Sequence, residues 1–200
     1  MGRITVTENV TLDGVMQAPG HPDEDTRGDF ALGGWAAPYA DAVLMEESGQ
    51  GMNATGAMLF GRLTYERFSA YWAQQTDGNP FTTFMNGIDK YVASRTLAAP
   101  LPWQNSHLLA GEATDRFGRV AQLRDEVEGD VAIIGSGALV RSLEAAGLVD
   151  AYHLNIHPLV LGAGTRMFAE RAPRRPLRLT ASVTTPSGVI MATYEPTETR

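Results

Sequence analysis

The sequence contains no cysteine, and this absence removes several kinds of chemistry at once. Disulfide bonds, thiolate metal sites and cysteine nucleophiles are all excluded. Long apolar runs are missing too, because none approaches the roughly 18 residues that a membrane-spanning helix needs. The first residues also lack an apolar stretch of signal-peptide length. We therefore expect a soluble protein of the cytoplasm.

Positive charge is scarce as well. The 16 Lys and Arg residues are outnumbered by 23 Asp and Glu residues, which gives a formal net charge of −7. An acidic balance of this size argues against nucleic acid or an anionic membrane as the main partner. A chain of 200 residues can bury a proper core, and no repeat or linker divides it. We predict a single domain over residues 1–200.

The sequence contains short apolar runs that end at glycine and continue into helical patterns. The most distinct one covers residues 131–143, where aliphatic residues lead to the Gly-Ser-Gly turn at 135–137 and then to a helix. A second run at 57–60 ends at Gly61 in the same way. In the first turn, Ser136 is expected to cap the following helix, and the N–H groups of that helix start favour an anion. The pattern predicts a phosphate contact.

The fold class follows from the order of these patterns. Strands are predicted at 3–11, 57–60, 90–94, 106–110, 131–134 and 150–161, helices at 38–52, 63–71, 115–127 and after 137, and turn-rich segments at 12–29 and 79–89. Two alternating runs at 177–185 and 188–194 predict a final hairpin. Alternating strands and helices indicate a parallel sheet. We predict an α/β fold with a mostly parallel central sheet, helices on both faces and an antiparallel C-terminal hairpin.

Six motifs occur in a fixed order along nearly the whole chain. They are TLDG at 11–14, LFGRLTYE at 59–66, VASRTL at 92–97, IIGSGALVRSL at 133–143, GLVDAYHL at 147–154 and HPLVLGAGTRMF at 157–168. In these motifs the chain resembles the dihydrofolate-reductase-like family, and within it the relatives of the reductase domain of the riboflavin-biosynthesis deaminase-reductase. The resemblance implies a dihydrofolate-reductase-like fold, NADPH as the cofactor and a homodimer.

The resemblance also implies three cofactor-binding segments. In the family, the first holds cofactor phosphate at a helix start, the second meets the 2′-phosphate of the adenosine ribose, and the third lies along the pyrophosphate. A guanidinium fork suits the 2′-phosphate dianion. The matching residues are Gly61, Arg62, Leu63 and Thr64 in the first segment, Ser94 and Arg95 in the second, and Gly135, Ser136, Gly137, Ala138 and Leu139 in the third.

Two positions depart from the relatives. Dihydrofolate reductases commonly join two glycines by a cis peptide in the third segment, whereas this chain has Gly135-Ser136. A cis bond before serine costs roughly 2.5 to 4 kcal/mol, which leaves open whether this chain keeps the cis geometry. Reductases of the riboflavin pathway typically place a glutamate just before this turn to hold the pyrimidine substrate. Ile134 stands there instead, which disfavours a ribosylaminopyrimidine substrate.

Candidates for the substrate side also come from the resemblance. Trp35 and Asp41 fall in W-A-A-P-Y-A-D, similar to the W-x-x-P-x-D motif that lines the pterin pocket, with one extra residue before the acid. Trp35 is expected in the pocket wall, and Asp41 is the first candidate for delivering a proton or holding a substrate N–H. Asp13 and Asn155 are further candidates. Two alternatives remain open: a helix N-terminal role for Asp41 and a turn-forming role for Asp13. No metal site is expected.

These observations predict an NADPH-dependent reductase that transfers a hydride to a small heterocyclic substrate, pterin-like or pyrimidine-like. Two other functions remain as alternatives. One is the 5-amino-6-(5-phosphoribosylamino)uracil reductase of riboflavin biosynthesis. The other is a non-catalytic module that holds NADPH or a heterocycle. The expected partners are the small-molecule substrate and a second copy of the chain.

Overall fold

The computed structural model describes residues 2–168 and 174–197. The chain forms two compact units, which are described separately below. Unit 1 consists of Met1–Thr5 and Gly49–Val149, and unit 2 consists of Val6–Ser48 and Asp150–Arg200. No helix in the described part of the chain is both long and apolar enough to cross a membrane. The prediction of a single domain stays a prediction.

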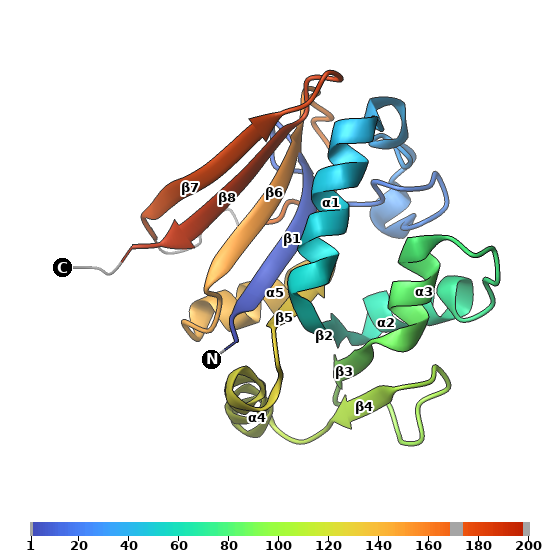
Figure 1. The fold of residues 1–200 in the computed structure, drawn as a ribbon, viewed down its shortest axis with the longest axis vertical. Coiled ribbons are helices and arrows are strands. Elements are labelled where there is room, and N and C mark those ends of the chain that lie inside the picture. Colours follow the sequence, from blue (N-terminus) through green and yellow to red (C-terminus); the bar gives the residue numbers. More distant parts are fainter. Residues whose placement is uncertain (1, 169–173, 198–200) are drawn as a thin grey trace. The chain divides into compact units, whose positions relative to one another are not determined.

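Unit 1 holds the parallel strands (Figure 1). Its strands are β2 (Thr55–Gly61), β3 (Asp89–Ala93), β4 (Ser106–Leu109) and β5 (Asp130–Ile134), hydrogen-bonded in the order β4-β3-β2-β5. Its helices are α2 (Arg62–Trp72), α3 (Pro80–Gly87), α4 (Ala113–Glu126) and α5 (Gly137–Ala145). Helix α2 starts directly after β2, and two residues separate the end of β5 from the start of α5, as the two glycine junctions predict.

Unit 2 holds the antiparallel hairpin. Its strands are β6 (Ala151–His157), β7 (Leu177–Thr184), β8 (Ile190–Pro196) and most of β1 (Ile4–Thr11), in the order β1-β6-β8-β7. Strand β8 pairs antiparallel with both β6 and β7. Helix α1 (Ala42–Ala54) begins in unit 2 and ends in unit 1. The eight described strands belong to one mixed sheet, so the predicted fold class is confirmed.

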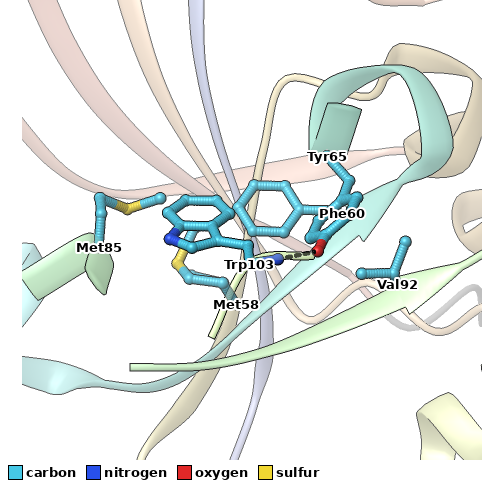
Figure 2. Packing of buried hydrophobic residues seen from close by; sticks show 7 residues of the cluster. Met58, Phe60, Tyr65, Met85, Val92 and Trp103 are labelled. Atoms are coloured by element: carbon cyan, nitrogen blue, oxygen red, sulfur yellow. Dashed lines mark hydrogen bonds between the residues drawn. The ribbon is translucent and has the colours of Figure 1, made fainter. Parts of the chain in front are cut away.

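The core of unit 1 is built around aromatic rings (Figure 2). Trp103, just before β4, is 1% exposed and lies with its ring centroid 6.3 Å from that of Phe60 on β2 and 6.2 Å from that of Tyr65 on α2. The Trp103 backbone N–H donates to the Tyr65 hydroxyl over 3.1 Å. Met58, Met85, Val92 and Ala132 complete the buried cluster. This packing fixes α2, and with it the helix start at Arg62, against the parallel strands.

Two element boundaries were predicted wrongly, each for a local reason that involves a proline. The helix predicted from residue 38 begins at Ala42, since Pro38 lies in a separate 3₁₀ turn and Ala40 is extended. The extended segment predicted over 150–161 ends as a strand at His157, directly before Pro158, which cannot donate to a sheet.

The segment 79–89, predicted as turn-rich, contains helix α3. Its start has an ordinary signature: the Asn79 side chain accepts a hydrogen bond from the Phe81 N–H at 2.9 Å, and Pro80 occupies the first helical turn. Thr82 and Met85 form its buried side. The Asn-Pro pair therefore marked a helix start, not an irregular loop.

Candidate cofactor and substrate sites

The three predicted cofactor segments follow neighbouring strands of unit 1. Gly61 ends β2 and lies opposite Ala93 of β3 in the parallel register, so Gly61 and Ser94 are at the same edge of the sheet. Strand β5 runs parallel to β2 on its other side and leads into Gly135. The structure thus brings these segments together at the carboxyl ends of three parallel strands, where α/β sheets bind ligands.

The starts of α2 and α5 at this edge have no side-chain caps. Gly61 and Ser136 occupy the N-cap positions, neither makes a capping hydrogen bond, and no acidic residue lies in either first turn. By contrast, Asn79 caps α3, and an Asp41 oxygen accepts from the Leu44 N–H in the first turn of α1. Helix α4 also lacks a cap but carries Asp115 in its first turn. Only α2 and α5, among these described helices, offer uncapped N–H donors without a nearby acid, which suits an anion.

Ser136 links the two turns. Its hydroxyl accepts a hydrogen bond from the Gly61 N–H at 3.0 Å and donates one to Thr64 Oγ1 at 2.7 Å. A Cβ at Gly61 would lie 3.3 Å from the same hydroxyl oxygen, which is tighter than most Cβ contacts, so glycine favours this close approach. The prediction that Ser136 caps α5 is wrong, because the Ser136 hydroxyl bonds to the turn at Gly61 and makes no hydrogen bond to α5. The Ser136 backbone is left-handed (φ 62°, ψ 42°). The Gly135-Ser136 peptide is trans.

Arginine side chains are present beside these turns. Arg95 is exposed and makes no ion pair with the described residues, while Arg62 pairs with Glu66 one helical turn away at 2.9 Å. An exposed pair of this kind contributes little stability, so a phosphate can compete with Glu66. Ser94 is buried, and its hydroxyl accepts from the Thr96 and Leu97 N–H groups at 3.1 and 3.0 Å. Ser94 therefore shapes the turn that carries Arg95.

In unit 2, both Asp41 oxygens are already bonded. One accepts from the Leu44 N–H at 2.9 Å and the other from the Ser187 N–H at 3.0 Å. These hydrogen bonds, that from Leu44 foremost, hold the pKa of the Asp41 carboxyl well below its usual range. An ionised, fully engaged carboxylate is a poor proton donor. The geometry favours the alternative role, in which Asp41 caps α1 and ties it to the hairpin turn.

Asp13 is engaged in a similar way. It accepts from the Thr11 hydroxyl at 2.6 Å and from the Leu161 and Gly162 N–H groups at 3.2 and 2.9 Å. These bonds, chiefly that from Thr11, lower the pKa of the Asp13 carboxyl to about 2. Asp13 thus joins the turn after β1 to the turn after β6, which favours its turn-forming role over an acid role.

The other two substrate-side predictions, Trp35 and Asn155, meet in one cluster. We call Asn9, Trp35, Tyr39, Asn155 and His157 the Asn9 cluster. Two nitrogens converge on Asn9 Oδ1: His157 Nε2 at 3.0 Å and Asn155 Nδ2 at 3.3 Å. The His157 ring is buried, with Trp35 and Tyr39 packed against it at 5.2 and 5.5 Å between ring centroids, both nearly perpendicular to it. The cluster thus joins polar side chains of β1 and β6 to two aromatic rings within unit 2.

Asn9, Tyr39 and His157 were not predicted as site residues. The alternation along the strands could have identified two of them. Asn9 shares a polar face of β1 with Thr7 and Thr11, and His157 shares a face of β6 with the predicted residue Asn155. Burial lowers the pKa of His157 to about 4, so its imidazole is neutral at pH 7. The cluster therefore carries hydrogen-bonding groups but no net charge.

Comparison with known proteins shows the family. The model of the RibD C-terminal domain matches residues 3–191. The chain belongs to the RibD C-terminal domain family. Among curated proteins, this RibD C-terminal domain protein is 26% identical over 149 residues to the uncharacterised protein YyaP of Bacillus subtilis, covering 72% of this chain and 75% of YyaP.

Solved structures confirm the predicted fold of this RibD C-terminal domain protein. A pyrimidine reductase-like protein of Corynebacterium diphtheriae superposes with a TM-score of 0.66 at 13% identity, over 99% of this chain and 93% of the other. Dihydrofolate reductase from Enterococcus faecalis, solved with NADP(H) and RAB-propyl, superposes with a TM-score of 0.58 at 13% identity, over 98% of each chain. At these identities the superpositions show the shared fold.

Proposed function

We propose that this RibD C-terminal domain protein is an NADPH-dependent reductase that transfers a hydride to a small heterocyclic substrate. The observation that carries the proposal is the pair of uncapped helix starts at Gly61 and Ser136, together with Arg95 after the neighbouring strand, which forms no ion pair within residues 2–168 and 174–197. Backbone N–H groups at two helix starts suit a pyrophosphate, and a free guanidinium suits the 2′-phosphate. The Enterococcus neighbour solved with NADP(H) supports the same cofactor.

In this proposal the reduced nicotinamide supplies the hydride, and the protein binds and orients the reactants. The α2 and α5 starts hold the pyrophosphate, and the Ser136 hydroxyl keeps the two turns at a fixed separation. The proton is assigned to an ordered water, because Asp41 and Asp13 are both held in the ionised form. We propose the cytoplasm as the compartment, where NADPH is available.

Family membership favours one second candidate, the 5-amino-6-(5-phosphoribosylamino)uracil reductase of riboflavin biosynthesis. Ile134 argues against it, because this residue packs on the apolar core of unit 1 and offers no carboxylate to a pyrimidine. Turnover of the ribosylaminouracil substrate would establish this function. Tight NADPH binding without NADPH oxidation across a panel of imines and carbonyls would instead indicate a non-catalytic binding module.

Replacing Arg95 with alanine is expected to weaken NADPH binding about tenfold or more, because a charge-assisted hydrogen bond contributes roughly 1.5–3 kcal/mol. NADH binding should be unchanged, since NADH lacks the 2′-phosphate. Fluorescence titration of both dinucleotides measures the two dissociation constants. Arg62→Ala is the matched control, and it should weaken both dinucleotides because they share the pyrophosphate. Equal losses for both dinucleotides in Arg95→Ala would remove Arg95 from this role, and wild-type protein that binds no NADPH at micromolar concentrations would refute the function.

We also propose that two copies pair through the edge strand β7. Residues 178–184 of this strand are all exposed, including Leu179 at 50% and Val183 at 37%. An edge strand with exposed apolar residues is a ready partner for a second copy of itself. Light scattering should give twice the 21.6 kDa chain mass, and Leu179→Lys should halve it. Met45→Lys, which changes an exposed apolar residue on α1 (68% exposed), should leave the mass unchanged. A wild-type monomer would refute the pairing.

A further inference from the structure

The orientation of the Asn9 side chain is set by its two hydrogen bonds in unit 2. Its Oδ1 faces both His157 Nε2 and Asn155 Nδ2. A carbonyl oxygen only accepts, so both nitrogens carry the donated protons and both lone pairs of Oδ1 are in use. The Asn9 amide nitrogen therefore lies on the opposite side of the carboxamide from His157.

Hydrogen-bonding capacity remains on both carboxamides. Within the described residues, the Asn9 Nδ2 protons and Asn155 Oδ1 have no partner, and both side chains are only half-buried. Asn9 thus presents a donor, and Asn155 presents an acceptor from the neighbouring strand. A donor and an acceptor on neighbouring strands are the two groups that an amide needs, since an amide presents a carbonyl oxygen and an N–H.

Within the Asn9 cluster, no side chain carries a carboxylate, ammonium or guanidinium group. The imidazole that bonds to Asn9 is the buried His157, and the rings of Trp35 and Tyr39 pack against it. The carboxylates of Asp13 and Asp41 are bonded to backbone N–H groups elsewhere in unit 2. A cationic amidine requires a carboxylate partner, whereas a neutral amide is satisfied by carboxamides.

We propose that Asn9 and Asn155 bind a neutral amide group of the ligand. Two sources share this chemistry: the lactam edge of a heterocyclic substrate and the carboxamide of nicotinamide. The inference deepens the proposed function and rests on it for the nature of the ligands. It makes Asn9 and Asn155 specificity-determining residues and His157 a positioning residue that acts through Asn9.

Lumazine, a pteridine with two lactam edges, tests the substrate source against 2,4-diaminopteridine, which has the same ring system and no lactam. The full-length protein should bind lumazine at least tenfold more tightly, as measured by fluorescence quenching. Asn9→Ala and Asn155→Ala should each weaken lumazine about fivefold. Asn9→Asp should shift the preference toward 2,4-diaminopteridine. Thr7→Ala, on the same side of β1, is the matched control and should change neither affinity.

The nicotinamide source is tested with NADPH and its 3-acetylpyridine analogue, in which a methyl ketone replaces the carboxamide. If the site binds this carboxamide, Asn155→Ala and Asn9→Ala should weaken NADPH about fivefold and the analogue much less. Binding of 2′,5′-ADP, which lacks nicotinamide, should stay constant in both variants. A change in the lumazine arm alone assigns the site to the substrate, and a change in the NADPH arm alone assigns it to the cofactor.

The amide site is refuted if neither arm responds to the two alanine variants, whether or not the probes bind the wild-type protein. A wild-type preference for 2,4-diaminopteridine, with NADPH binding unaffected by the variants, refutes it too. Failure of the proposed function has a different signature, namely wild-type protein that does not bind 2′,5′-ADP. The lumazine arm does not depend on that result.

Discussion

Replacing Trp103 with alanine is expected to lower the free energy of unfolding by about 3–5 kcal/mol. The side chain is 1% exposed, so its removal leaves a cavity among the rings of Phe60 and Tyr65 (Figure 2). The indole N–H also donates to Asn86 Oδ1 over 2.7 Å, and this bond fixes the loop before β4 to α3. Chemical denaturation of the wild-type and variant proteins measures the difference.

Lys90 increases this expected loss. Its ammonium lies 4.6 Å from the centre of the Trp103 ring and donates to the Ile88 and Gln104 carbonyl oxygens. Burial lowers the pKa of Lys90 to about 8, so the buried cation depends on these contacts. Trp103→Phe, which keeps an aromatic ring but loses the indole N–H, is the matched control and should cost much less. A loss below about 1 kcal/mol for Trp103→Ala would contradict this account of the core.

The strand-glycine-helix junctions were predictable because their causes are local. The apolar runs before Gly61 and Gly135 are short enough for strands, and glycine followed by helical spacing marks each transition. That both junctions lie at the same end of the sheet followed from the parallel arrangement of the strands. The same reasoning did not predict α3, although its Asn79-Pro80 start was readable from the residues alone.

The chemistry of individual side chains was less predictable, because it depends on partners distant in the sequence. Ser136 was expected to cap its own helix, yet its hydroxyl bonds to Gly61 and Thr64, more than 70 residues away. Asn9 was not predicted as a site residue, because His157, its nearest partner, lies 148 residues later. Such contacts arise from the pairing of strands, and hydrophobic periodicity carries no information about them.

Acidification is expected to destabilise the protein through His157. Burial lowers the pKa of this imidazole from 6.5 to about 4 in the folded state, so the unfolded chain binds more protons between these values. The free energy of unfolding should therefore fall as the pH falls from about 6.5 to about 4, by up to about 3 kcal/mol from this one residue. Denaturant unfolding at pH 7 and at pH 4.5 measures this fall.

His157→Gln separates this residue from the carboxylates, because glutamine does not titrate and its amide can still donate to Asn9 Oδ1. Asp13 has a lowered pKa of about 2, so its contribution is lost only as the pH falls below about 4. The two titrations therefore occupy separate pH ranges. The variant should lose most of the stability change between pH 7 and pH 4.5, and an unchanged slope would show that the wild-type imidazole is not held neutral by burial.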